Sequence, residues 1–341
     1  LVAPRRRVRH RPCRDRGLPE AGFTAGQLLA YPWSEQVVNE RTSGAGWPAS
    51  VLVTGATSGI GLATALLLAR QGRQVIGTAR SKDKADALVS TARAQGLALD
   101  AVVMDLTDPV SCREAVAGAA DLTDGGPHAL VANAGIPLTG AITDLSEDRI
   151  REVLEVNVVG TLRMCTLVLP VMRRRGRGRI VTVSSAGARI PSPMSGWYAA
   201  SKHALSAATH SLRMETRRYG VQVVLVEPGT VATPFWDRAQ EDLSALTTAH
   251  GDAGLNDRAA RLFSRIQRSA GGPQPVARTI AKALGVPRPR RRYTVGLDAH
   301  LGTALQYAAP LWLSDHIKTR LFALHTPAAA DPTGVAQASG S

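Results

Sequence analysis

Cysteine and aromatic residues are scarce in this chain of 341 residues. It has three cysteines, Cys13, Cys112 and Cys165, which lie far apart in the sequence. Thiols so few and so scattered exclude a disulfide framework and a zinc cluster, so we expect no metal site and a reducing, cytoplasmic location. Aromatic residues make up 4% of the chain, which leaves few rings on which nucleic-acid bases could stack.

Long apolar runs are also missing. A membrane-spanning helix needs roughly 20 consecutive apolar residues. The most apolar stretch, around Val153–Met172, is interrupted by Asn157 and Arg163. We therefore expect a soluble protein without a membrane span.

The positive charge of the chain is concentrated in three places. The formal net charge is +14, and the excess of arginine lies in residues 1–50, Arg173–Arg179 and Arg288–Arg292. The chain between them is nearly neutral, which is typical of arginine-rich loops in solvent rather than of a continuous nucleic-acid surface. We expect no nucleic-acid partner, and binding to an anionic surface through these arginines stays an alternative.

Composition divides the chain into three regions. Residues 1–48 are rich in Arg, Pro and Gly and lack periodicity, which predicts a disordered or misassigned N-terminal extension. Residues 49–325 are the expected single domain, and residues 326–341 are a predicted flexible tail.

Within the domain, short β-branched runs alternate with amphipathic stretches. Apolar strands separated by helices indicate a parallel sheet covered on both faces, and right-handed crossovers make it doubly wound. The predicted strands are Val51–Thr54, Gln74–Thr78, Ala101–Met104, Ala129–Ala132, Arg179–Ser184, Gln222–Glu227 and Tyr293–Val295. The predicted helices are Gly59–Gln71, Lys82–Gln95, Pro109–Ala120, Glu147–Arg174, Tyr198–Tyr219 and Pro275–Leu284, and the helix-biased segment Phe235–Gly272 is placed to form a lid.

A glycine-rich turn follows the first strand. The sequence Thr54-Gly55-Ala56-Thr57-Ser58-Gly59-Ile60-Gly61 joins that strand to a helix. Glycines allow a tight turn and a close approach of the backbone, and the positive end of the helix suits a pyrophosphate. In this strand-to-helix context the turn predicts a dinucleotide site.

The end of the second strand indicates which dinucleotide binds. An NAD site usually carries an acid there for the ribose 2′-hydroxyl, but this chain has Arg80 and Ser81. A guanidinium pairs well with a phosphate, so we expect NADP (NADPH) to be preferred over NAD. The alternative is that Arg80 is an ordinary surface side chain.

Several motifs follow in a fixed order. They are Asn133-Ala134-Gly135 after the fourth strand, Asn157 within Val156-Asn157-Val158, Ser184-Ser185 after the fifth strand, Tyr198-Ala199-Ala200-Ser201-Lys202, and Pro228-Gly229 with Thr233 after the sixth. Together with the glycine-rich turn, this series resembles the short-chain dehydrogenase/reductase family over about residues 50–300. The resemblance implies a Rossmann fold with seven parallel strands and an NAD(P)-dependent oxidoreductase. Two positions depart from it: Ala132 stands where the family commonly has Asn, and Ser58 where many NADP-preferring members have a basic residue.

The spacing of Tyr198 and Lys202 carries the expected chemistry. These residues are four apart, so both lie on one side of a helix. An ammonium beside a phenol favours the phenolate, and we expect the pKa of Tyr198 to be lowered so that it acts as acid in reduction or base in oxidation. By resemblance, Ser185 would hold the substrate oxygen, with Ser184 as the alternative, and Asn157 would anchor a water that links Lys202 to solvent.

The remaining cofactor contacts are also implied by the resemblance. Asp105 matches the position that binds adenine, while Asp108 fits better as the cap of the following helix. Thr233 belongs to the segment around the nicotinamide carboxamide. The full expected set is Gly55, Thr57, Ser58, Gly59, Ile60, Gly61, Arg80, Ser81, Asp105, Leu106, Asn133, Ala134, Gly135, Tyr198, Lys202, Pro228, Gly229, Val231 and Thr233.

The substrate pocket is expected between Ile136–Ala141, Arg189–Trp197 and the lid. An apolar wall of Ile190, Met194, Trp197, Phe235 and Trp236 favours a hydrophobic, steroid-, retinoid- or ketoacyl-like ketone or alcohol, although such residues could equally be ordinary core. The chain looks like the hydroxysteroid and retinol dehydrogenase branch. The resemblance also implies a homodimer or homotetramer formed through the two long helices. A catalytically silent NADP-binding regulator is the alternative function.

Overall fold

The protein is described by a computed structural model over residues 48–246, 253–322 and 324. The predictions for residues 1–48 and 326–341 fall, apart from residue 48, outside these described residues.

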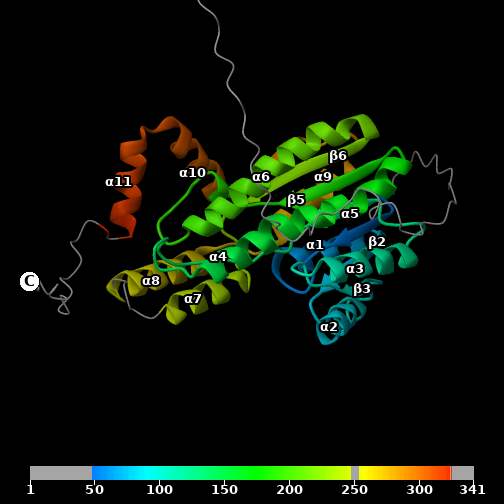
Figure 1. Ribbon diagram of the computed structural model, residues 1–341, viewed down its shortest axis with the longest axis horizontal. Coiled ribbons are helices and arrows are strands. Elements are labelled where there is room, and N and C mark those ends of the chain that lie inside the picture. The colour runs from blue at the N-terminus through cyan, green and yellow to red at the C-terminus, as the bar shows by residue number, and fades with distance from the viewer. Residues whose placement is uncertain (1–47, 247–252, 323, 325–341) are drawn as a thin grey trace, which may run out of the picture. The chain divides into compact units, whose positions relative to one another are not determined.

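The centre of the fold is a single parallel sheet (Figure 1). Its seven strands have the order β3-β2-β1-β4-β5-β6-β7, and every neighbouring pair is parallel. The seven predicted strands are confirmed with end shifts of at most one residue, and so is the doubly wound architecture. The strands are β1 (Ser50–Val53), β2 (Gln74–Ala79), β3 (Asp100–Val103), β4 (Ala129–Ala132), β5 (Gly178–Val183), β6 (Val221–Pro228) and β7 (Arg292–Val295).

Helices cover both faces of the sheet because its central strands are apolar on both sides. Val51 and Val53 of β1 pack with residues of α1, α2 and α9 in one core cluster, while Leu52 between them is buried on the opposite face. The opposite face is covered by α3, α5 and α6, which contact the sheet or one another. These helices are α1 (Gly59–Arg70), α2 (Lys82–Arg93), α9 (Gln274–Gly285), α3 (Pro109–Leu122), α5 (Thr161–Arg174) and α6 (Gly196–Thr216).

The predicted single helix Glu147–Arg174 is interrupted, so this prediction was wrong in detail. It consists of α4 (Glu147–Leu154), a π-helical turn (Glu155–Gly160) and α5. π-helical turns arise where a local insertion breaks the regular ladder, and they recur at functional sites. By length and composition alone the whole run could cross a membrane, but 44% of its apolar window is buried inside the protein, as in a core helix.

Four further helices lie beyond the carboxyl ends of the strands (Figure 1). The lid segment contains α7 (Phe235–Ala245) and α8 (Ala253–Ser269), which pack on each other. After β7 come α10 (Leu297–Ala308) and α11 (Leu311–Leu321), which the sequence pattern did not predict. The carboxyl ends of the strands therefore lie beneath helices from two separate parts of the chain.

Candidate active site

A cavity of about 640 Å³ opens at the carboxyl ends of the central strands. Ligands of doubly wound sheets bind at this place, where the strand order reverses between β1 and β4. Fourteen of the nineteen predicted cofactor residues line the cavity: Gly55, Thr57, Ser58, Gly59, Ile60, Arg80, Asp105, Leu106, Asn133, Ala134, Gly135, Tyr198, Lys202 and Thr233.

The glycine-rich turn needs its glycines for conformation and for space. Gly55 and Gly59 have φ of 65° and 54°, a region that other residues enter at a cost. A Cβ on Gly61 would collide with the Gly55 carbonyl oxygen. The turn therefore closes tightly, with its backbone at the cavity and Ser58 as the N-cap residue of α1.

Hydrogen bonds from β4 fix this turn. The Thr54 hydroxyl accepts from the backbone N–H groups of Asn133 and Ala134, both at 3.0 Å. The Asn133 side chain donates to the carbonyl oxygens of Thr54, at 3.1 Å, and Gly55, at 3.3 Å. Asn133 thus holds the backbone of the glycine-rich turn by two hydrogen bonds and also lines the cavity.

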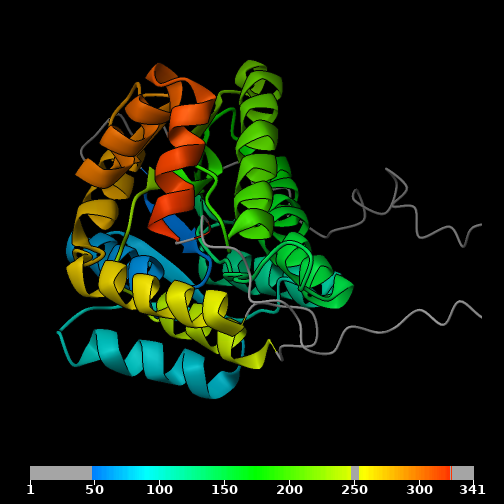
Figure 2. The same cartoon turned by 90° about the vertical axis from the view of Figure 1, so that its left-hand side faces the viewer.

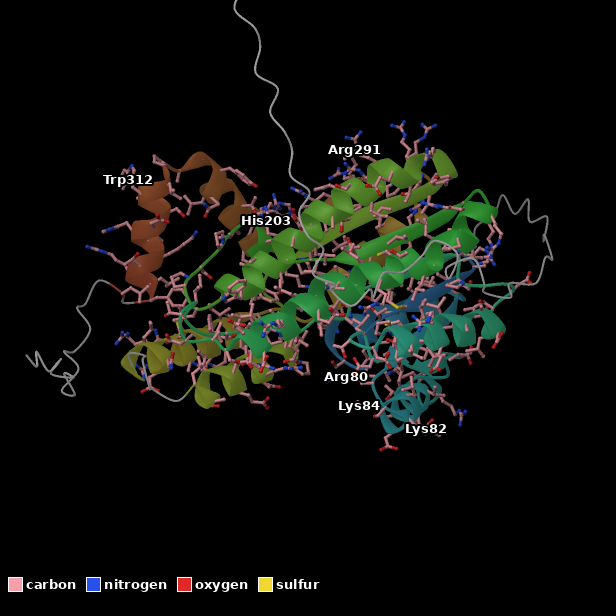
Figure 3. All side chains as sticks on the ribbon, viewed as in Figure 1. Arg80, Lys82, Lys84, His203, Arg291 and Trp312 are labelled. Atoms are coloured by element: carbon pink, nitrogen blue, oxygen red, sulfur yellow. The ribbon has the colours of Figure 1, made fainter. Side chains whose placement is uncertain are left out.

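The basic end of the cavity differs from the prediction. Arg80 lines it as expected, but the Ser81 hydroxyl caps α2 by accepting from the Lys84 N–H at 3.4 Å, and Ser81 is not among the lining residues. Lys84 lines the cavity instead, and Figure 3 shows it close to Arg80 at the start of α2. The signal for Lys84 was its position in the first turn of a helix, where the side chain reaches back toward the preceding strand end.

The loop after β3 places Asp105 and Leu106 in the cavity lining, and the contact of Asp105 with adenine stays a prediction. The Asp105 carboxylate accepts from the backbone N–H and the hydroxyl of Thr107, both at 2.8 Å, which fixes it at the rim. Asp108 caps α3 by accepting from Val110 N–H at 2.7 Å, as predicted.

Of the four residues predicted as cofactor contacts in the segment after β6, only Thr233 lines the cavity. Thr233 contacts the glycine-rich turn, since a Cβ on Gly59 would lie 2.9 Å from its methyl group. Pro228 and Gly229 do not line the cavity, because Asp298 of α10 occupies the space beside Gly229 and its carboxylate accepts from Thr230 N–H at 2.6 Å. Val231 also lies outside the lining set: it forms a β-bridge with Gly271, and its carbonyl oxygen accepts from the Trp236 ring N–H at 3.0 Å.

Asn157 is fully buried in the π-helical turn. Its Oδ1 accepts from Ile136 N–H at 2.9 Å, and its Nδ2 donates to the Ile136 carbonyl at 3.0 Å and to the Ser201 hydroxyl at 3.0 Å. The side chain therefore ties the loop after β4 to α6. The water relay expected for Asn157 stays a prediction.

Tyr198 lies within the protein beside the cavity, and the expected lowering of its pKa was wrong. Burial raises the pKa of Tyr198 to about 12, and a hydrogen bond with the Ser185 side chain opposes that rise. The neighbouring Ser184 hydroxyl is occupied elsewhere: it donates to the Lys202 carbonyl at 3.0 Å and pairs with the Ser206 hydroxyl at 2.9 Å. Of the two serines, Ser185 is the one whose hydroxyl meets the phenol.

Lys202 brings a cation to the same place. Its Nζ donates to the Val183 carbonyl at 3.2 Å, and a Cβ on Gly135 would lie 3.1 Å from Nζ and 3.0 Å from Asn157 Oδ1. Burial lowers the pKa of Lys202 to about 8. Lys202, Asn157 and the loop after β4 are thus packed as one unit at the inner end of the cavity.

A family model for short chain dehydrogenases matches residues 49–244, more than half of the chain. The chain belongs to this family.

Curated relatives support the same family assignment. The chain is 36% identical over 253 residues to human 17-beta-hydroxysteroid dehydrogenase type 1, covering 71% of this chain and 76% of that protein. It is 36% identical over 259 residues to retinol dehydrogenase 8 of Bos taurus, covering 72% and 81%. It is 31% identical over 271 residues to 3-ketodihydrosphingosine reductase of Bacteroides thetaiotaomicron, covering 79% and 95%.

Solved short-chain dehydrogenases have the same fold. A short chain dehydrogenase/reductase of Burkholderia phymatum in complex with NAD gives a TM-score of 0.66 at 25% identity, covering 83% of this chain and 96% of that one. An actinorhodin polyketide ketoreductase variant with NADPH gives 0.63 at 30% identity, covering 73% and 96%. This short-chain dehydrogenase therefore shares its fold with nicotinamide-binding relatives.

The residues of this short-chain dehydrogenase fit a nicotinamide dinucleotide. A Cβ on Gly55 would lie 2.9 Å from the Ala134 Cα, so glycine lets the turn pack closely on the loop after β4. The turn leads into the N-terminus of α1 at the cavity, and the free N–H groups of a helix N-terminus suit a pyrophosphate. Arg80 and Lys84 provide cations at one end of the cavity, and Lys202 provides one at the other. The family thus supports a hydride-transfer oxidoreductase that acts on CH–OH groups.

The lid of this short-chain dehydrogenase is held to the body by ion pairs that sequence reasoning missed. Arg238 of α7 pairs with Glu152 of α4 at 2.8 Å, and both side chains line the cavity. Arg149 of α4 pairs with Glu152 and with Asp242 of α7. We call these four residues the lid latch. Helical spacing alone could not reveal it, because its partners are about 90 residues apart.

The predicted apolar wall is divided between the cavity and the core. Phe235 lines the cavity and makes an edge-on contact with Tyr198, with ring centroids 5.2 Å apart. Met194 and Trp236 belong to a cluster with Phe263 and Phe322, and Trp197 packs with a different cluster. Ile190 lies against Gly302 of α10.

Proposed function

We propose that this short-chain dehydrogenase is a reductase that prefers NADPH and acts on a hydrophobic ketone or aldehyde. The observation that carries the proposal is that Tyr198 and Lys202 line the same cavity as Arg80 and Lys84, while Ser185, which is not itself a lining residue, forms a hydrogen bond with the Tyr198 phenol. The nicotinamide, when bound, supplies the hydride for the substrate carbon.

The proton comes from Tyr198. A phenol with a pKa of about 12 is protonated at pH 7, which is the form that donates a proton from Oη to the substrate oxygen. The Ser185 hydroxyl holds that oxygen by a hydrogen bond, and the Lys202 ammonium stabilises the phenolate that remains. Asn157 acts as a positioning residue for the loop after β4, and we propose that the water it anchors returns a proton toward Lys202.

The cofactor preference rests on charge. No acid follows β2, and Arg80 and Lys84 both line the cavity there, so a 2′-phosphate would meet two cations. The remaining predicted contacts, including Ser58, Asp105 and Thr233, are proposed as binding residues for the same dinucleotide. Gly61, Ser81, Pro228, Gly229 and Val231 are assigned supporting roles in place of direct contact.

The substrate class rests on the apolar surroundings of Tyr198 and on the relatives. Phe235, Ile136 and Pro137 line the cavity near the phenol, and the relatives named above are a steroid, a retinol and a ketosphingoid enzyme by their names. We therefore propose a substrate with a long or polycyclic hydrocarbon body. We also propose a homo-oligomer in a reducing cytoplasm, a setting that suits the free, buried thiols of Cys112 and Cys165.

The test begins with titration of the purified chain with NADPH and with NADH, followed by turnover on a panel of hydrophobic ketones. NADPH binding that is tighter than NADH binding, with turnover of a panel member, is the expected result. Tyr198→Phe is the matched control, because it removes only the phenolic hydroxyl. It should bind NADPH as the parent does and reduce turnover by about a thousandfold. Turnover retained by this variant, or failure of the parent to bind either dinucleotide, would overturn the proposal.

A further inference from the structure

The helices α10 and α11 carry their large apolar side chains on the outside. The buried residues of this pair are small, namely Ala299, Thr303 and Ser314. The side chains of Leu297 and Trp312, by contrast, are 73% and 69% exposed. The exposed apolar residues of the two helices are Leu297, Leu301, Leu305, Tyr307, Leu311, Trp312, Ile317 and Leu321. An apolar patch of this kind marks an interaction surface rather than a solvent face.

A row of arginines lies on the neighbouring helix α8. Arg261, Arg265 and Arg268 are spaced by four and three residues, which places them on one face of the helix, and all three are exposed. The opposite face of α8 packs inward through Phe263, whose ring contacts that of Phe322 at the end of α11, with centroids 6.1 Å apart. Figure 2 looks onto α8, α10 and α11 together.

Cations also occur on the apolar helices themselves. Arg320 is exposed at the end of α11, and Lys318 donates to the Gln306 side chain at 2.7 Å on the adjoining helix. Trp312, marked in Figure 3, stands on the same helix. The exposed Asp315 of α11 offsets one of these cations, so the positive charge of this face comes mainly from the arginines of α8. Apolar side chains beside a basic row are typical of surfaces that enter the headgroup layer of an anionic bilayer.

A continuous line of aromatic rings leads from this surface to the active site. It runs from Phe322 to Phe263, Trp236, Phe235 and Tyr198, with centroid separations of 6.1, 5.8, 5.9 and 5.2 Å. The end of α11 is therefore connected to the Tyr198 phenol by a series of ring contacts.

We propose that α8, α10 and α11 form a docking face for the surface of an anionic lipid bilayer, from which the enzyme takes its hydrophobic substrate. The apolar side chains of α10 and α11 enter the headgroup layer, and the arginines of α8 contact the lipid phosphates. The proposal that the bilayer binds is argued from this surface alone. The proposal that the bilayer delivers the substrate also depends on the proposed function.

Two other occupants fit the docking face less well. Residues 325–341 contain one valine and no leucine, isoleucine, methionine or aromatic residue, so this segment lacks side chains to cover the patch. A second copy of the chain would bring a second row of arginines to the same contact, and like charges repel. An anionic bilayer supplies both the apolar layer and the negative charge.

The experiment measures binding of the full chain to vesicles by sedimentation, without dinucleotide or substrate. Vesicles of phosphatidylcholine alone are compared with vesicles that contain phosphatidylglycerol. We expect partitioning at least about tenfold stronger on the anionic vesicles, weakening as salt is raised. A blue shift of tryptophan emission should accompany binding and should be lost in Trp312→Phe. Equal partitioning on both vesicles, or none, would overturn the proposal.

Variants separate the two parts of the docking face. Leu301→Ser/Trp312→Ser and Arg261→Gln/Arg265→Gln should each reduce partitioning by about tenfold. Val110→Ser/Leu122→Ser is the matched control, since both residues are exposed apolar positions on α3. The variants should keep the parent's NADPH affinity and its turnover of a small water-soluble ketone, which shows that they are folded.

The outcomes distinguish this proposal from the proposed function. If the chain binds vesicles but not NADPH, the docking face stands and the proposed function fails. If the parent is a lipid-free dimer that Leu301→Ser/Trp312→Ser dissociates, the face is an interface between copies and the bilayer proposal is overturned. If Leu301→Ser/Trp312→Ser and Arg261→Gln/Arg265→Gln both partition onto anionic vesicles like the parent, the bilayer proposal is overturned as well.

Discussion

The side chain of Asn157 clamps the backbone of Ile136 from both sides, accepting from its N–H at 2.9 Å and donating to its carbonyl at 3.0 Å. One amide group thereby holds the loop after β4 in the place where Gly135 meets Lys202. The π-helical turn is what directs this amide at the loop. The position of Lys202 therefore depends on a side chain from another helix.

Removal of this clamp should cost stability as well as activity. Asn157→Ala leaves the Ile136 backbone groups buried without partners, so we expect a loss of about 2–4 kcal/mol in the free energy of unfolding, measured with urea. Ser201→Ala removes the third partner of Asn157 and the hydrogen bond from the Ser201 hydroxyl to the Tyr198 carbonyl, but leaves the clamp on Ile136 intact. It serves as the comparison, with an expected loss of about 1 kcal/mol. Equal losses for both variants would show that the clamp on Ile136 carries no special weight.

The two cations proposed to contact the 2′-phosphate, Arg80 and Lys84, give a prediction about cofactor selection. Arg80→Gln and Lys84→Gln should each raise the dissociation constant for NADPH by about tenfold and leave that for NADH within about twofold, because only NADPH carries the 2′-phosphate. Lys82→Gln is the control: Lys82 pairs with Asp86 and does not line the cavity, so it should change neither constant. Parallel losses for both cofactors in the Arg80 variant would show that Arg80 does not recognise the 2′-phosphate, and no change in either constant would assign Arg80 to the surface.

The buried charge of Lys202 predicts a pH-dependent stability. Because burial lowers its pKa from 10.5 to about 8, the folded state has already released this proton between about pH 8 and 10.5 while the unfolded state still holds it. Stability of the parent should therefore rise with pH in that window relative to Lys202→Met. Below pH 8, where the charge is buried in full, the variant should be more stable by up to about 3 kcal/mol. Urea titrations at pH 7 and pH 10 measure the difference, and a constant difference between the two pH values would contradict the assignment.

The same ionisation should appear in the rate. Ketone reduction, measured as kcat/KM, should be level between pH 6 and 7 and fall above about pH 8 as Lys202 loses its charge. Tyr198 does not cause this fall, because its raised pKa of about 12 keeps the phenol protonated throughout. A profile that stays level to pH 10 would mean that the ammonium is not needed.

The lid latch predicts a link between α7 and cofactor retention. Arg149→Met removes the residue that bridges Glu152 and Asp242, so α7 should separate from α4 more often. We expect faster proteolysis within residues 235–269 and about fivefold weaker NADPH binding. Arg151→Met, which removes an exposed pair within α4 only, is the matched control. Unchanged proteolysis would show that the latch does not restrain the lid.

The sequence predicted correctly those features whose place in the fold follows directly from a local residue pattern. The seven strands could be predicted because buried parallel strands are apolar on both faces, and Arg80 because it directly follows a strand end. Ser81 and Lys84 show where prediction from the local pattern fails. Both lie in the same short segment, and the geometry at the start of α2 decides that Ser81 caps the helix while Lys84 lines the cavity.

Other features depend on contacts that no local pattern contains. The π-helical turn exists where Asn157 meets Ile136 and Ser201, and the pKa of Tyr198 is set by enclosure rather than by the spacing to Lys202. The helices α10 and α11 were not predicted. An apolar stripe on a helix normally faces the core, but the large apolar side chains of these two helices are exposed.

The bond between Asp298 and Thr230 N–H joins the start of α10 to the loop that follows β6. That loop continues to Thr233, which touches the glycine-rich turn. The C-terminal helices are therefore not a detachable appendage. A chain shortened before Leu297 would lose both its apolar exterior and the carboxylate that holds the loop after β6, so the two features cannot be removed separately by truncation.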